Sequence, residues 1–123
     1  MSRELINAIC AQFPGAEVSD PWADMNSSED GQGHDAWKVG GKMFASIGAK
    51  TPGVSVKTDS IETARMLIDV GVGIKAPYFH RSWVLLPFET GEDELRHRIA
   101  KSYEIIRGKL TKKAQAALPD YPA

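Results

Sequence analysis

The chain has 123 residues with a net charge of −1, and 42% of its residues are hydrophobic, 25% are charged and one is a cysteine. These values are typical of one soluble domain with a single core, and they exclude an intramolecular disulfide framework. No apolar run approaches the roughly 18 residues of a membrane span, and the first residues lack the apolar core of a signal peptide. We therefore expect one cytoplasmic domain over residues 1–123, with no membrane partner.

Charge is distributed unevenly along the chain. Residues 1–35 contain seven acids and one base, whereas residues 96–113 contain seven bases and one acid. A slightly acidic chain argues against strong phosphate binding. The basic segment leaves two interpretations open, which are a solvated helix face and a weak phosphate-binding surface.

The first third of the chain predicts a helix, an edge strand and a loop. Apolar residues at helical spacing indicate a helix over 2–13, and Pro14–Gly15 ends it. Cys10 lies on the apolar side of this helix, so we expect a buried thiol. Residues 17–22 predict a short edge strand, because Pro21 lacks a backbone donor. The polar, acidic residues 23–35 predict a mobile loop.

A β-hairpin is the clearest local prediction. Two extended runs, 36–39 and 42–47, flank Gly40–Gly41, which suits a primed turn with positive φ. Strict alternation along the second run places Met43, Ala45 and Ile47 on one face and Phe44 and Ser46 on the other.

The remaining segments alternate between strands and helices. Residues 54–57 and 83–88 predict strands, and the second is apolar on both faces. A helix is predicted over 60–70, with Asp59 or Ser60 as its N-cap and Gly71 at its end. Residues 72–82 predict no regular element. A long amphipathic helix is predicted over 93–109.

The order α-β-β-β-β-α-β-α predicts an α+β domain with two layers, in which helices pack on one face of a mainly antiparallel sheet. Shared periodicity also predicts the core residues. The predicted core is Leu5, Ile9, Phe13, Val39, Met43, Ala45, Ile47, Val54, Val56, Leu67, Ile68, Leu85, Leu95, Ile99 and Ile106.

Three blocks of sequence together form a family pattern. They are Trp37–Ala45, then Ala76–Tyr78 with Trp83–Val84, then Glu94–Leu95 with Ile99, Ser102–Tyr103 and Leu110. In this order they resemble the MmcQ/YjbR-like family of small bacterial proteins. The resemblance implies a two-layer α+β domain and a DNA-binding surface that is described in the family as a "double wing". The net acidity of this chain and its acidic 23–35 segment depart from a strong DNA binder, so any binding is expected to be weak.

The candidate nucleic-acid-binding residues combine cations with aromatic neighbours, a mixture that can contact phosphates and stack on bases. They are Lys38, Lys42, His80, Arg81 and Trp83, with Tyr78 and Phe79 nearby in the sequence. The alternative interpretation is a solvated hairpin tip beside a core tryptophan.

We expect no catalytic activity, cofactor or metal. The three histidines lie on separate segments without metal-ligand spacing, and no phosphate-binding loop or nucleophile motif is present. Two functions follow. The first is weak, phosphate-directed DNA binding, and the second is a protein-interaction module that uses an open face of the sheet.

Overall fold

The computed structural model describes residues 3–19, 34–48, 51–77 and 79–121. Within these residues the helices and strands follow one another in the order α1, β1–β4, α2, β5, β6, α3 and α4. The helices are α1 (Arg3–Ala11), α2 (Ile61–Asp69), α3 (Glu92–Gly108) and α4 (Lys112–Ala116). The strands are β1 (Glu17–Ser19), β2 (Asp35–Val39), β3 (Lys42–Ile47), β4 (Gly53–Lys57), β5 (Ile74–Lys75) and β6 (Trp83–Pro87).

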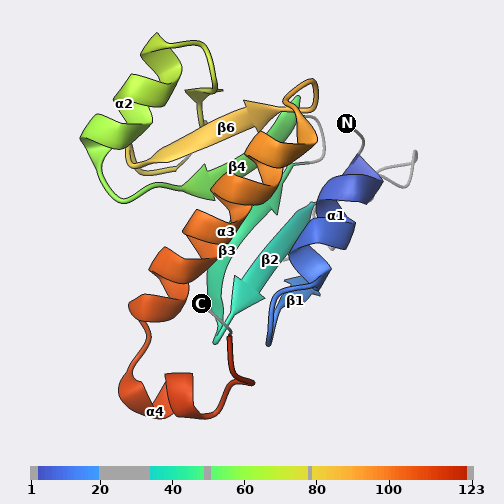
Figure 1. Cartoon of the computed structure of the whole chain (residues 1–123), viewed down its shortest axis with the longest axis vertical. Helices are drawn as coiled ribbons and strands as arrows, with labels where there is room; N and C mark the ends of the chain where they lie inside the picture. Colours follow the sequence, from blue (N-terminus) through green and yellow to red (C-terminus); the bar gives the residue numbers. More distant parts are fainter. Residues whose placement is uncertain (1–2, 20–33, 49–50, 78, 122–123) are drawn as a thin grey trace.

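The six strands form one open sheet in the order β1-β2-β3-β4-β6-β5, and every pair of neighbours is antiparallel. Helices α1 and α3 lie together on one face of this sheet, and α2 packs beside β5 and β6 (Figure 1). The α+β prediction of a mainly antiparallel sheet with helices on one face is confirmed. No described helix has the length and apolar character needed to cross a membrane.

Local chemistry explains most element boundaries. Ser60 caps α2, because its Oγ accepts a hydrogen bond from the Thr63 backbone amide at 3.0 Å. Gly71 follows α2 with a φ of 82°, as an αL residue after a helix does. Gly40 and Gly41 have φ of 57° and 83°, which confirms the primed turn of the hairpin.

Three predictions about elements need correction. Asp35 belongs to β2 rather than to a loop, and the rest of the predicted 23–35 loop lies outside the described residues, apart from His34. The segment 72–82 contains the two-residue strand β5, which forms through pairing with β6. The short helix α4 was not predicted; the Thr111 side chain caps it by accepting from the Ala114 amide.

A β-bulge in β3 changes which residues enter the core. Trp37 pairs with Ala45 but Lys38 pairs with Met43, so β3 has one extra residue, Phe44, at this point. Phe44 is fully buried and meets the Tyr103 ring edge-on, with ring centroids 5.3 Å apart. Phe44 and Ala45 therefore both face the helices. The predicted strict alternation, with Phe44 on the face opposite Ala45, is wrong because the bulge breaks the period of two.

Most of the predicted core is confirmed, and the exceptions are clear. Ile68 is 38% exposed on α2, so its assignment to the core is wrong. Met43 is only partly buried, while Leu5 and Phe13 are partly buried and pack against the core. The core also contains residues outside the predicted set. These are Ile6, Cys10, Trp37, Phe44, Val84, Leu86 and Tyr103.

Candidate nucleic-acid interface at one end of the sheet

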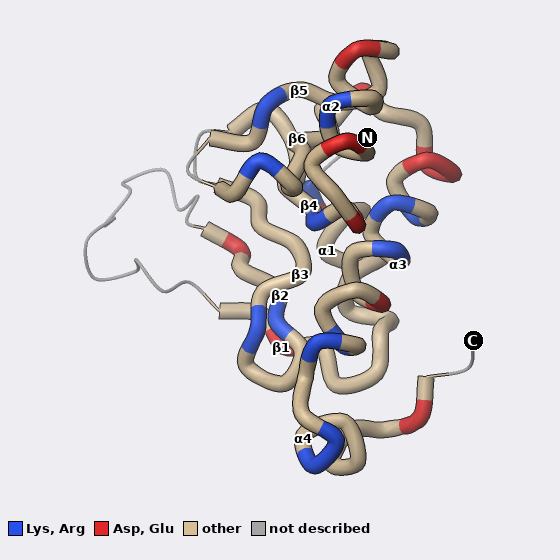
Figure 2. The backbone as a smooth tube through the Cα atoms, turned by 90° about the vertical axis from the view of Figure 1, so that its left-hand side faces the viewer, with Lys and Arg blue, Asp and Glu red and all other residues tan. Residues whose placement is uncertain are grey.

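The antiparallel pairing brings five chain segments together at one end of the sheet. Strands β2, β4 and β5 end there, whereas β3 and β6 begin there. Each of these strand ends carries a basic or aromatic residue. In order across the sheet, they are Lys38, Lys42, Lys57, Trp83 and Lys75. We call this the basic end of the sheet. Figure 2 faces this side, and Lys and Arg segments occur along it from β5 and α2 down to α4.

The hairpin tip at the basic end packs against the end of α3. A Cβ atom on Gly40 would lie 2.6 Å from Leu110 Cδ1, so the glycine allows this close approach. Leu110 lies two residues after the end of α3, and α4 begins two residues later. Lys109, Lys112 and Lys113 therefore lie on segments adjoining the hairpin that carries Lys42. The structure brings these basic residues to the same end of the molecule, although about 70 residues separate them in the sequence.

Lys38 has a less favourable setting than Lys42. Its cross-strand partners are Glu17 on β1 and Met43 on β3. A carboxylate directly opposite a lysine reduces the positive field there. Lys42 is exposed beside the turn and pairs with Val39. Of the two predicted hairpin lysines, Lys42 is therefore the better placed to meet an anion.

Lys57 is the cation at the centre of the basic end. Its Nζ donates a short hydrogen bond to Ser82 Oγ, and this oxygen lies 2.8 Å from His80 Nδ1. The pKa of Lys57 is lowered, first because burial removes water from the ammonium group and then because Lys109 lies nearby. Two ammonium groups close together favour an anion between or beside them.

His80, Arg81 and Trp83 are brought together, as their closeness in the sequence predicts. They line a hollow of about 380 Å³ between α2 and residues 75–76 and 79–83. Phe79 stacks on Trp83 with ring centroids 4.6 Å apart and an interplanar angle of 27°. Tyr78 lies outside the described residues. Strands β3 and β4 separate β2 from β6, so the two hairpin lysines do not line this hollow.

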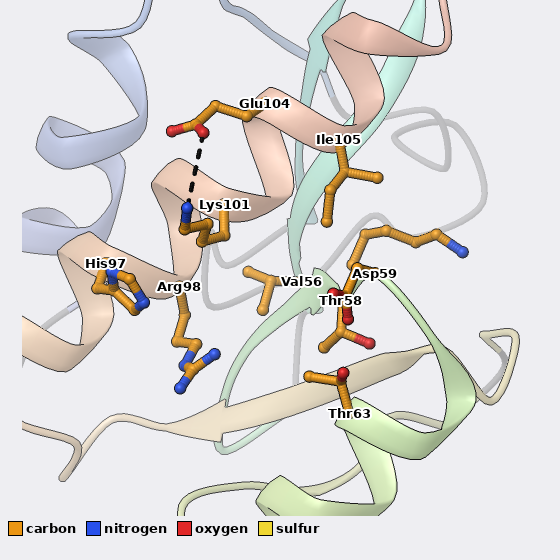
Figure 3. A pocket seen from close by; sticks show the side chains of 10 residues that line it. Val56, Thr58, Asp59, Thr63, His97, Arg98, Lys101, Glu104 and Ile105 are labelled. Carbon is orange, nitrogen blue, oxygen red and sulfur yellow. Dashed lines mark ion pairs between the residues drawn. The ribbon is translucent and has the colours of Figure 1, made fainter. Parts of the chain in front are cut away.

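A second hollow, of about 420 Å³, lies between α3, the end of β4 and the start of α2. Figure 3 shows Lys101 and Glu104 on α3 on one side of it, with Thr58, Asp59 and Thr63 on the other. Lys101 Nζ lies 3.9 Å from a Glu104 carboxylate oxygen. This hollow contains two acids beside its cations, so its charge is more nearly balanced.

The first half of the basic segment 96–113 is neutralised by acids of the same helix. Arg96 bonds Glu92 at 2.8 Å and Arg98 bonds Glu94 at 2.6 Å, both with i, i+4 spacing. These residues fit the interpretation as a solvated helix face. The three lysines after residue 108 have no ion pair within the described part of the chain.

The face of the sheet away from α1 and α3 is not open at its centre. Ser46 pairs with Ser55, and Ser55 with Leu85, along a row on this face. All three residues are buried. The middle of this face therefore does not offer the exposed apolar surface that the protein-interaction alternative assumes.

Two further features of the chain are its possible metal ligands and its single thiol, Cys10. These contain no cluster of three or more His, Cys, Asp or Glu side chains that could hold a metal ion. Cys10 is fully buried, and burial, together with the nearby Asp35 carboxylate, raises the pKa of its thiol to about 12. Cys10 is therefore a small core residue at neutral pH, as predicted.

Comparison with known protein families tests the family resemblance that the three sequence blocks indicated. The model of the YjbR family matches residues 11–105, which cover β1 to β6 and most of α3. The chain belongs to the YjbR family. A search of curated proteins found no match to it. Membership of the YjbR family is consistent with the observed α+β fold and supplies no ligand or site residue.

Sequence reasoning missed three contributors to the basic end, which are Lys57, Arg65 and Lys75, whereas Lys109 belongs to the basic segment 96–113 for which phosphate binding was left open. The missing information was the strand order, because β4 pairs with β6 across the intervening α2 and β5. This pairing places Lys57 opposite Trp83, and the pairing of β5 with β6 places Lys75 opposite Val84. The sequence could have indicated the position of Arg65, because it lies one turn after Ile61 and one turn before Ile68 on the same side of α2. All three side chains line the hollow.

Proposed function

We propose that this YjbR-family chain is a non-catalytic protein that binds DNA weakly, through phosphate contacts at the basic end of the sheet. The observation that supports the proposal is the convergence of cations from separate elements. Lys42 comes from β3, Lys57 from β4, Lys75 from β5 and Arg81 from the connection to β6. Lysine and arginine side chains bind phosphate oxygens without reading the base sequence.

The distribution of acids favours this surface over the rest of the molecule. Glu89, Glu92, Asp93 and Glu94 lie around the start of α3, which follows the opposite end of β6. A chain with a net charge of −1 can still present a locally positive surface to DNA, because these four acids lie at the opposite end of β6. With only a few phosphate contacts, affinity should lie in the non-specific range of roughly 10⁻⁴–10⁻⁶ M at physiological salt.

Fluorescence anisotropy with a labelled duplex, measured at several salt concentrations, tests the proposal. With three or four phosphates neutralised, log K should fall with log salt with a slope of about −3. The double variant K42A/R81A should weaken binding to every duplex sequence alike and flatten the slope by about two units.

The matched control is R96Q/R98Q, which also removes two positive charges. These arginines form ion pairs with Glu92 and Glu94 on the first half of α3. The control should retain most of the affinity and the full salt slope. Absence of binding at tens of micromolar protein in low salt would refute DNA binding. Equal losses in the two double variants would refute this choice of surface.

A second candidate function is protein interaction through the outer side of α2. Met66 is 52% exposed and Val70 is 66% exposed, one turn apart on this helix, and the nearby Ile74 is also exposed. Exposed apolar clusters of this kind occur at protein interfaces. Light scattering of the pure protein over a range of concentrations would detect self-association, and the charge-introducing variant V70D should then abolish it.

A further inference from the structure

The hollow between α2 and residues 75–76 and 79–83 has an aromatic lining suited to a nucleobase. Phe79 and Trp83 are stacked on each other, and both line the hollow. Both are partly buried and lie outside the main hydrophobic core. A base can stack on an aromatic side chain whatever its identity, because every base has a π-face. The volume of about 380 Å³ lies within the range of small-molecule sites.

Cations surround this aromatic lining. Arg65 on α2, Lys75 on β5 and Arg81 before β6 line the hollow, against one acid, Asp69. None of the three cations makes an ion pair with any described residue. A phosphate group attached to a stacked base would therefore meet three cations against one acid in the lining of the hollow.

His80 adds a polar group at the same place. Its Nδ1 lies 2.8 Å from Ser82 Oγ and 3.2 Å from the Ser82 backbone nitrogen, which fixes one side of the imidazole ring. Among the described residues none hydrogen-bonds the other ring nitrogen, Nε2, and His80 is exposed and lines the hollow. A ring held in this way can present Nε2 to the edge of a base.

We infer that this hollow binds one unpaired nucleotide of a single strand, with the base against Phe79 and Trp83 and the phosphate among Arg65, Lys75 and Arg81. This inference rests on the proposed function and narrows its substrate class from DNA in general to single-stranded nucleic acid. In a duplex the bases are stacked on one another, so only an unpaired base can reach an aromatic hollow.

Three labelled probes test the inference by fluorescence anisotropy in low salt. They are an oligothymidylate of 12 nucleotides, an oligonucleotide of the same length made of abasic residues, and a 12-base-pair duplex. The wild-type chain should bind the oligothymidylate about tenfold more tightly than the abasic strand, because only the first can stack. Phe79→Ala should remove about tenfold of the oligothymidylate affinity and leave binding of the other two probes unchanged.

Met66→Ala is the matched control, since it truncates an exposed side chain on α2 that does not line the hollow. It should bind all three probes as the wild type does. Trp83→Phe keeps an aromatic ring at the second position and should retain most of the oligothymidylate affinity. A urea melt of each variant verifies folding before the titrations.

The possible results separate this inference from the proposed function. Equal binding of the base-containing and abasic strands, or an oligothymidylate affinity unaffected by Phe79→Ala, overturns the nucleotide site while leaving phosphate binding intact. Failure of all three probes to bind overturns the proposed function as well. A tenfold preference that Phe79→Ala abolishes and Met66→Ala preserves supports the site.

Discussion

Asn7 joins α1 to β2 through both atoms of its side-chain amide. Its Oδ1 accepts a hydrogen bond from Trp37 Nε1 at 2.8 Å, and its Nδ2 donates to Asp35 Oδ2 at 3.0 Å. Arg3 Nε donates to the same carboxylate oxygen at 2.9 Å. Trp37 is only 6% exposed, so water has little access to its indole N–H. The Asn7 side chain is therefore the partner that allows the tryptophan to be buried.

Asn7→Ala should destabilise the fold by about 1–3 kcal/mol, because the buried indole donor would lose its acceptor. Urea unfolding followed by circular dichroism measures this change. The effect should be smaller in a Trp37→Phe background, which has no indole donor to leave unpaired. The same loss in both backgrounds would show that the hydrogen bond to Trp37 is not its source.

At the scale of secondary-structure elements, a side chain of α3 replaces the backbone hydrogen bonds that β3 and β4 do not form beside the bulge. These strands pair at Ala45 with Val56 and at Ser46 with Ser55. At the next position Ser102 of α3 intervenes: its Oγ donates to the Phe44 carbonyl at 2.5 Å and accepts from the Lys57 amide at 2.8 Å. One buried hydroxyl therefore satisfies two backbone groups that the bulge leaves without a ladder partner.

We expect Ser102→Ala to cost about 1–3 kcal/mol of unfolding free energy, since a buried carbonyl and a buried amide both lose their partner. Amide hydrogen exchange at Lys57 should accelerate selectively, while exchange in the β2–β3 hairpin should change less. A urea midpoint equal to the wild-type value, together with unchanged exchange at Lys57, would contradict this role for Ser102.

At the scale of the whole molecule, the longest helix, α3, connects a group of acids at its start with the basic end of the sheet. Helix α3 begins with Glu92, Asp93 and Glu94, and its C-terminal end reaches the basic end of the sheet. Acids in the first turn of a helix and bases after its last turn also suit the helix dipole. The same arrangement therefore stabilises α3 and produces the positive surface on which the proposed DNA binding depends.

The stability of the whole fold should fall at alkaline pH. Burial first, and then the nearby Asp35, raises the pKa of Cys10 from 9.0 to about 12. Burial, followed by the Glu104 contact, raises that of Tyr121 from 10.0 to about 12. Both folded-state values exceed the unfolded ones, so their stabilisation is complete below about pH 9 and is lost as pH rises toward 12.

Urea unfolding at intervals from pH 8 to pH 11 measures this loss. The free energy of unfolding should decrease with pH in the wild type, beginning near pH 9, because the unfolded chain releases the Cys10 proton first. In the Cys10→Ala variant the free energy of unfolding should decrease less steeply between pH 9 and pH 10, where the titration of Tyr121 contributes little. Identical slopes in the two proteins would contradict the raised pKa of Cys10.

The sequence by itself determined the features that depend on neighbouring residues. The spacing of Ile9, Leu67, Ile99 and Ile106 predicted helix faces that are buried. Gly40–Gly41 predicted the hairpin turn, since two positive φ angles in succession suit glycine best. Within the candidate site, the local cluster of His80, Arg81 and Trp83 was predicted for the same reason, because these residues are nearly consecutive.

Only the tertiary structure decided which distant residues meet. The pairing of β4 with β6 brings Lys57 to Ser82, and the packing of α2 beside β5 and β6 places Arg65 at the hollow and leaves Ile68 exposed. At the bulge, the Phe44 ring packs against Phe13, which follows α1, and against Tyr103 of α3. The physical reason is common to all three: periodicity and turn chemistry act over a few residues, whereas strand order and bulges are set by burying a core shared by the whole chain.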